Sequence, residues 1–263
     1  MKRSLVACII ALGLAWPASA DVTMKQTTTG KGMGMSGTTT STTYIKGNKM
    51  RTDTVVGDRT QSMIFDLDAQ KMYMFDSKKK EADVYDMAAF AKEMSSAVDT
   101  SNMKVSMKAS GQSKEIAGRP ATGYDLEISV PAAMGGNKDM TMVMTLSGPT
   151  WIVKGAPGTA DYVGFYKAAV EKGWVFSDPR AAKGQPGQAK AMAEMYKQLA
   201  EAGGIAYETD MQMKMGGMSG PMAGLFAKMG NVSFATKMDS VETGAVSADL
   251  FAPPAGYKLN SKK

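Results

Sequence analysis

Short runs of alternating polar and apolar residues fill the chain from Val22 to about Val84. Turn dipeptides such as Gly47-Asn48 and Gly57-Asp58 separate these runs, which are rich in threonine, valine and methionine. Alternation with a period of two is typical of strands with one buried face, and such dipeptides favour tight hairpins. The pattern therefore predicts one continuous, curved antiparallel sheet rather than alternating strands and helices.

The same alternation returns later in the chain, interrupted by helical patterns. Further strands are predicted over 103–109, 113–116, 124–130, 140–146, 205–215 and 232–241. Apolar residues recur at helical spacing near 87–98, 159–172 and 188–202, which predicts three amphipathic helices. The proline- and glycine-rich segment 178–187 is expected to be a loop. The fold class predicted is mainly β with inserted helices (α+β).

The first 20 residues have the three parts of a secretory signal peptide. A basic start precedes a short apolar stretch, Leu5 to Trp16, and the small-residue site Ala18-Ser19-Ala20. We expect cleavage after Ala20 and a single mature domain over residues 21–263, located in the periplasm or secreted. No later stretch is long and apolar enough to predict a transmembrane helix.

Composition narrows the possible functions. The chain has 263 residues, 25 methionines, no histidine and one cysteine, Cys8, which lies in the expected signal peptide. The lack of histidine excludes Ser-His-Asp catalysis and imidazole-ligated zinc or haem. The basic residues are mostly scattered lysines, a pattern that favours solubility over nucleic-acid binding. We therefore predict no enzyme activity, no cofactor and no nucleic-acid partner.

One acidic motif is compatible with metal binding but does not complete the pattern. Asp66-Leu67-Asp68-Ala69-Gln70 begins like a calcium loop. Lys71 stands where the glycine of the sharp turn is needed, and Ser77 stands where the bidentate glutamate is needed. We interpret this segment as a turn with polar residues.

Methionines occur at alternate positions in three predicted strands, so each set is expected on one face of the sheet. These residues fill core positions, or they line a concave face that adapts to an irregular apolar ligand. Aromatic and methionine residues of the helices are expected to face them. The candidate ligand-binding residues are Met72, Met74, Met140, Met142, Met144, Met211, Met213, Phe165, Tyr166, Met192 and Tyr196.

A metal-binding interpretation stands beside the lipophilic one. Five thioethers lie within twelve residues, at Met211, Met213, Met215, Met218 and Met222. Soft thioether sulfur selects Cu(I) and, by the same softness, Ag(I). Met218 and Met222 lie in a glycine-rich segment where packing does not require them, whereas the strand methionines are explained by packing alone.

Several segments together resemble a known family. They are Tyr44-Ile-Lys-Gly-Asn-Lys-Met-Arg51, the hairpin Met63 to Phe75, Glu115-Ile-Ala-Gly-Arg-Pro120 with Tyr124, and Leu250-Phe-Ala-Pro-Pro-Ala-Gly-Tyr257. They resemble a secreted bacterial family of unknown function, which is similar to the periplasmic lipoprotein-carrier (LolA/LolB-like) superfamily. The resemblance implies an open half-barrel with a helical lid, and an acyl chain or another apolar molecule held between lid and sheet. It transfers no functional residue.

The sequence favours a non-catalytic periplasmic binding protein for a lipid or another lipophilic small molecule. A Cu(I)/Ag(I)-binding protein and a ligand-free structural or stress-related envelope protein are the alternatives. The sequence does not identify a protein partner.

Overall fold

A computed structural model describes residues 21–32, 35–96, 103–134, 137–174, 176, 178–216 and 232–262. The predicted signal peptide, residues 1–20, and the candidate metal ligands Met218 and Met222 lie outside the described residues. Within the described part, the strands form one 12-stranded sheet in the order β12-β6-β5-β4-β3-β2-β1-β11-β10-β9-β8-β7. Neighbouring strands are antiparallel except β12, which runs parallel to β6.

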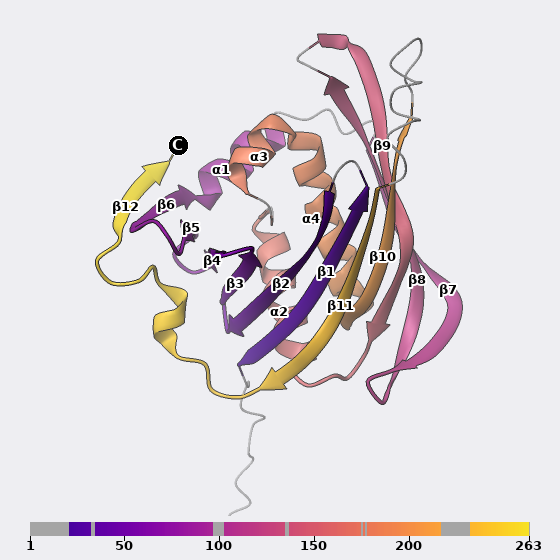
Figure 1. Cartoon of the computed structure of the whole chain (residues 1–263), viewed down its shortest axis with the longest axis horizontal. Helices are drawn as coiled ribbons and strands as arrows, with labels where there is room; N and C mark the ends of the chain where they lie inside the picture. The colour runs from indigo at the N-terminus through magenta and orange to yellow at the C-terminus, as the bar shows by residue number, and fades with distance from the viewer. Residues whose placement is uncertain are drawn as a thin grey trace, which may run out of the picture.

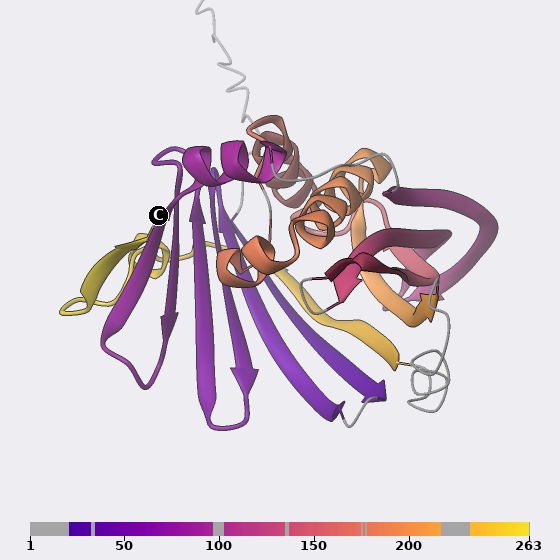
Figure 2. The ribbon, with the colours of Figure 1, turned by 90° about the horizontal axis from the view of Figure 1, so that it is seen from above.

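The strands are β1 (Val22–Gly32), β2 (Met35–Lys46), β3 (Lys49–Val56), β4 (Arg59–Asp66), β5 (Lys71–Asp76), β6 (Glu81–Asp86), β7 (Lys104–Ile116), β8 (Arg119–Met134), β9 (Asn137–Val153), β10 (Ile205–Gly216), β11 (Val232–Thr243) and β12 (Lys258–Lys262). The helices are α1 (Met87–Ser96), α2 (Thr159–Glu171), α3 (Pro179–Gly184), α4 (Pro186–Ala202) and the short 3₁₀ helix η1 (Ala248–Phe251). The sheet curves around α2, α3 and α4, which lie on its concave side (Figure 1). The view from above shows the strands fanning out beneath the helices (Figure 2). The predicted class, mainly β with an open curved sheet and inserted helices, is confirmed.

The loop predicted over 178–187 is wrong, because α3 and the start of α4 occupy this segment. Pro179 is the first residue of α3, and Pro186 is the first residue of α4. Proline is tolerated in the first turn of a helix, where its missing N–H would have no intrahelical partner. Asp178 supports α3 by accepting a hydrogen bond from the Arg180 N–H (2.9 Å) at Oδ1. The two prolines therefore begin helices here rather than interrupt them.

Two strand predictions also need correction. The separate strands expected over 103–109 and 113–116 are one strand, β7, with a register irregularity between Ala109 and Ser113. Gly111, within this irregularity, has a φ of 74°, which glycine adopts without strain. Strand β12 was not predicted, because its sequence, KLNSK, has no apolar alternation.

The concave face of the sheet carries an in-register row of buried apolar residues. Met72, Phe65, Met50, Ile45 and Val22 are direct neighbours across β5, β4, β3, β2 and β1. All five are buried in one cluster that also contains aromatic residues of α2. This row is the floor on which the helices pack.

The convex face of β4 to β6 is covered by the C-terminal segment, residues 244–262. Ile64 and Phe75 form a second buried cluster with Val246 and Phe251. Tyr257 meets the ring of Phe75 edge-on, with 5.7 Å between the ring centroids. This end of the sheet is therefore apolar on both faces.

Candidate functional site

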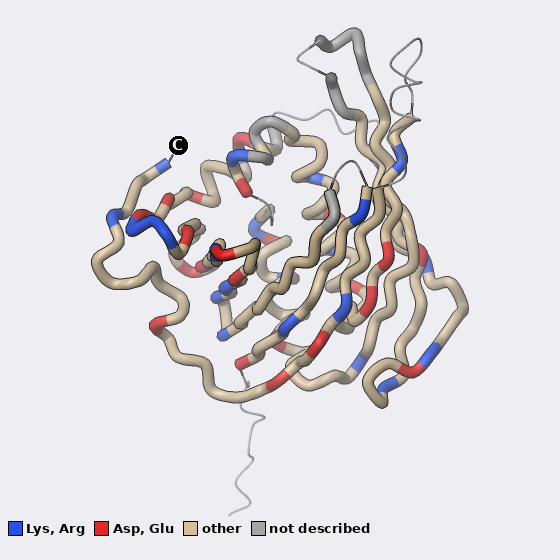
Figure 3. Tube along the Cα trace, in the orientation of Figure 1, with Lys and Arg blue, Asp and Glu red and all other residues tan. Residues whose placement is uncertain are grey.

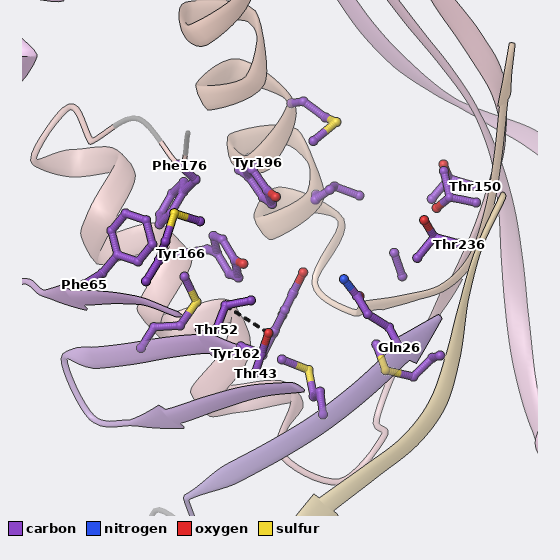
Figure 4. A pocket seen from close by; sticks show the side chains of 18 of the residues that line it. Gln26, Thr43, Thr52, Phe65, Thr150, Tyr162, Tyr166, Phe176, Tyr196 and Thr236 are labelled. Carbon is purple, nitrogen blue, oxygen red and sulfur yellow. Dashed lines mark hydrogen bonds between the residues drawn. The ribbon is translucent and has the colours of Figure 1, made fainter. Parts of the chain in front are cut away.

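A cavity of about 280 Å³ lies between the concave face of the sheet and the helices α2 and α4 (Figure 4). Strands on both sides of the central β1–β11 pair contribute to its walls. The lining residues are Met24, Gln26, Thr43, Met50, Thr52, Met63, Phe65, Leu126, Thr150, Tyr162, Tyr166, Phe176, Met195, Tyr196, Leu199, Ala206, Thr209, Thr236 and Met238. The cavity is slightly smaller than a typical small-ligand site of about 300–1,000 Å³.

Aromatic side chains form one wall of the cavity. Tyr162 and Tyr166 are four residues apart on α2, so they lie on the same helix face, with 4.7 Å between their ring centroids. The ring of Tyr166 stacks on Tyr196 of α4 at 4.9 Å and 9°, and Phe176 meets both rings at 4.9 and 5.0 Å. Figure 4 shows this group on one side of the cavity, with Phe65 beside it. The wall is fixed by ring packing between two helices and the sheet.

Methionines contribute much of the remaining apolar lining. Met24, Met50, Met63 and Met238 come from four strands, and Met195 comes from α4. An unbranched thioether side chain adapts its shape to irregular apolar surfaces. The cavity thus combines a rigid aromatic wall with adaptable methionine walls.

The polar lining consists of hydroxyl and amide groups. Thr43 and Thr52 share a hydrogen bond of 3.1 Å between their Oγ1 atoms, and Gln26 lies near them on the sheet. None of the described residues that line the cavity is charged. Burial raises the pKa of the phenols of Tyr162, Tyr166 and Tyr196, so these hydroxyls stay protonated at physiological pH.

The structure brings only part of the predicted set to this cavity. Tyr166 and Tyr196 line it, whereas Phe165, Met72 and Met74 lie in the adjoining core. Met211 and Met192 belong to a separate cluster beside α4. Met142 is buried, while Met144, Met213 and Met215 are half-buried on β9 and β10. The side chain of Met140 lies outside the described part of the chain.

Sequence reasoning missed several lining residues. Met24, Met50 and Met238 alternate with polar residues in their strands, so the signal used for the other methionines was also present here. The threonines were missed because a threonine in a strand is equally typical of either face. Only the pairing of the strands shows which threonines face inward.

No family model matches the sequence, and no curated protein matches it. Among solved structures, PNGF-II is similar over 92% of this chain at 10% identity and a TM-score of 0.37. The chain spans 31% of the length of PNGF-II. A LolA superfamily protein from Nitrosomonas europaea is similar over 89% of this chain and 91% of its own, at 8% identity and a TM-score of 0.31.

A DUF1329 family protein from Desulfovibrio piger is similar over 90% of this chain and 91% of its own, at 9% identity and a TM-score of 0.31. The sequence resembles a secreted family of unknown function and the lipoprotein-carrier superfamily, and a protein of that superfamily is among these structural matches. Among the described helices, none is both long and apolar enough to cross a membrane.

Proposed function

We propose that this chain is a non-catalytic binding protein for a lipophilic ligand, located in the periplasm or secreted. The cavity between α2, α4 and the concave face is the observation that carries the proposal. Its walls are mainly aromatic and thioether side chains, which favour an apolar ligand because they remove it from water. The sequence has no histidine, and the described residues that line the cavity include no acid–base pair suited to catalysis.

The cavity volume limits how much of a lipid it holds. A methylene group takes up about as much space as a water molecule, about 30 Å³. A volume of 280 Å³ therefore holds an alkyl chain of roughly nine or ten carbons. Each methylene removed from water contributes about 0.8 kcal/mol. A medium-length chain, or part of a longer one, is therefore the expected occupant.

Filling the cavity tests the proposal. Ala206 of β10 lines the cavity, so Ala206→Phe places a ring in the space that the ligand would occupy. We expect saturable binding of diphenylhexatriene, an apolar fluorescent probe, to the wild type, displacement by a medium-chain lipid, and an affinity at least about tenfold lower for Ala206→Phe. The binding is measured by fluorescence titration.

Ala235→Phe is the matched control, because Ala235 lies exposed on the neighbouring strand β11 and does not line the cavity. It should bind the probe like the wild type. Equal binding to a denatured sample, or unchanged binding by Ala206→Phe with a normal thermal unfolding curve, would contradict the proposal and favour a ligand-free structural role.

The location is tested separately. We expect intact-mass measurement of the envelope or secreted fraction to give a chain that begins at Asp21 without acyl mass. A chain that begins at Cys8 with lipid attached would show that the cleavage assignment is wrong.

A second candidate function, Cu(I) or Ag(I) binding, is favoured by the methionines of β9 and β10. Met144 and Met215 are direct cross-strand neighbours, and Met213 lies one step along the same face, opposite Leu146. The double variant Met144→Leu/Met215→Leu keeps the side-chain volume and removes two sulfurs. Competition with a Cu(I) chelator under reducing conditions should show weaker binding by this variant. No uptake by the wild type would remove this candidate.

A further inference from the structure

Five threonines form a row across the concave face of the sheet. Thr150 of β9 is paired with Thr209 of β10, and Thr209 is paired with Thr236 of β11. The row continues through Thr28 of β1 to Thr39 of β2, again by direct pairing. Because paired residues of neighbouring strands point to the same face, all five side chains lie on the concave side.

The inner end of this row lies in the cavity. Thr150, Thr209 and Thr236 line it, whereas Thr28 and Thr39 lie beyond it along the sheet. Figure 4 shows Thr150 and Thr236 close together on the sheet wall, across the cavity from the aromatic group. The cavity therefore has an apolar side and a hydroxyl-bearing side.

The fold gives no structural role to the hydroxyl group of Thr150. Only 1% of its surface is exposed, and its Oγ1 has no hydrogen-bond partner. It is the one buried side-chain oxygen or nitrogen without a partner in the described part of the chain. Valine has the same shape without the hydroxyl, so packing alone gives no reason for threonine here. By contrast, Thr236 Oγ1 is paired with Thr28 Oγ1 at 2.9 Å.

The residues around this wall disfavour a charged ligand group. Among the described residues, no lysine or arginine lines the cavity, so a carboxylate bound there would be desolvated without a counter-ion. Lysines and acidic residues are instead interspersed along the strands elsewhere (Figure 3). An uncharged group that accepts or donates a hydrogen bond loses much less on transfer from water.

We propose that Thr150, with Thr209 and Thr236 beside it, binds the uncharged polar head of an amphiphile whose alkyl chain lies against the methionine and aromatic walls. The ligand class is a neutral hydroxyl-bearing lipid, such as a fatty alcohol or a monoacylglycerol, rather than a free fatty acid. This inference rests on the proposed lipophilic binding function and adds the chemistry of the head group. The raised pKa of the three cavity tyrosines supports it, because the opposite wall also stays uncharged.

Two ligands with ten-carbon chains and one fluorescent probe without a polar group separate head-group recognition from apolar binding. They are decanol, decanoate and diphenylhexatriene, which has no polar group. We expect decanol to displace diphenylhexatriene at a concentration at least about tenfold lower than decanoate at pH 7.5, because only decanoate brings a charge into the cavity. Decanol affinity should not change between pH 5 and 8, whereas decanoate should bind more tightly as its carboxylate becomes protonated.

The variant Thr150→Val removes the hydroxyl and keeps the shape. We expect it to weaken decanol binding about three- to tenfold, to leave diphenylhexatriene binding unchanged, and to unfold at or above the wild-type temperature. Thr40→Val is the matched control, because Thr40 is exposed on β2 and does not line the cavity. It should leave the affinities for all three probes unchanged.

The outcomes distinguish this inference from the function on which it rests. Saturable binding of diphenylhexatriene, with equal affinity for decanol and decanoate and no effect of Thr150→Val, would overturn the head-group assignment and leave the apolar site standing. Tighter binding of decanoate than of decanol at pH 7.5 would also overturn it. Failure of all three probes to bind would overturn both the assignment and the proposed function.

Discussion

Asp66 is a carboxylate held almost entirely out of water at the turn between β4 and β5. Its Oδ1 accepts hydrogen bonds from the N–H groups of Asp68 (3.1 Å) and Ala69 (2.9 Å), and Lys49 Nζ lies 2.7 Å from its Oδ2. Burial by itself raises the pKa of Asp66, but the hydrogen bonds from Ala69 and Lys49 outweigh it, so the net pKa is lowered. The segment that begins like a calcium loop thus uses its first carboxylate to close the turn.

This lowered pKa gives the first prediction. The ionised form of Asp66 contributes stability that is complete above its unfolded pKa of about 3.9 and is lost as the pH falls through the lower folded value. We expect Asp66→Asn to lower the free energy of unfolding at pH 7 by about 1–2 kcal/mol, with a smaller loss below pH 3. Asp58→Asn is the control, since Asp58 pairs with Lys78 at the exposed surface and should cost less than about 1 kcal/mol. Chemical denaturation at both pH values measures the difference, and an equal loss for the two variants would contradict it.

At the scale of elements, β9 depends on one glycine. A Cβ at Gly148 would lie 1.9 Å from the backbone oxygen of Asp210 in β10. At this point β9 and β10 are therefore too close together for any residue other than glycine. The dipeptide Gly148-Pro149 favours a turn in the sequence, yet β9 continues through it to Val153. This is why the strand predicted over 140–146 ended too early.

The second prediction concerns this close approach. We expect Gly148→Ala to destabilise the protein by about 1–3 kcal/mol, because the backbone of β10 must shift to admit the methyl group. Gly164→Ala is the matched control on α2, where a Cβ would meet nothing within 4 Å. Since alanine is favoured over glycine inside helices, it should stabilise by about 0.5–1 kcal/mol. Thermal unfolding distinguishes the two, and a neutral Gly148→Ala would show that the strands can separate there.

At the scale of the whole molecule, the C-terminal segment connects distant parts of the sheet. Asp21 Oδ2 accepts hydrogen bonds from Lys46 Nζ (2.6 Å) and from the N–H of Val246 (2.8 Å), which joins the start of the described chain to this segment. Arg51 donates a hydrogen bond to the carbonyl oxygen of Leu250 (3.1 Å). Strand β12 then covers the β6 edge, which would otherwise present unpaired backbone groups.

The third prediction separates the two roles of this segment. A chain ended after Tyr257 should remain folded but self-associate at high concentration, because the β6 edge is then unpaired. Phe251→Ala should instead lower the free energy of unfolding by about 3–5 kcal/mol, because Phe251 fills the convex cluster. Light scattering and thermal unfolding measure these effects. A shortened chain that unfolds as readily as Phe251→Ala would show that β12 is required for the fold itself.

Local periodicity was enough to predict the sidedness of many elements. Met72 and Met74 do contact the same core, and Tyr162 and Tyr166 do share the buried face of α2, because sidedness is set by the repeat of the element itself. Asp86 accepts a hydrogen bond from the Ala89 N–H (2.9 Å) and so caps the start of α1 by a local contact.

The cavity was decided by the tertiary structure. Thr28 and Thr236 are neighbours although 208 residues separate them, and only the register of β1 on β11 makes them so. Strand register, the parallel pairing of β12 and the placement of α2 and α4 all depend on contacts between distant segments, which no local pattern encodes. The sequence by itself therefore determined a curved sheet with amphipathic helices. The packing of those helices against the sheet decided which methionines and threonines face the cavity, and which hydroxyl there was left without a partner.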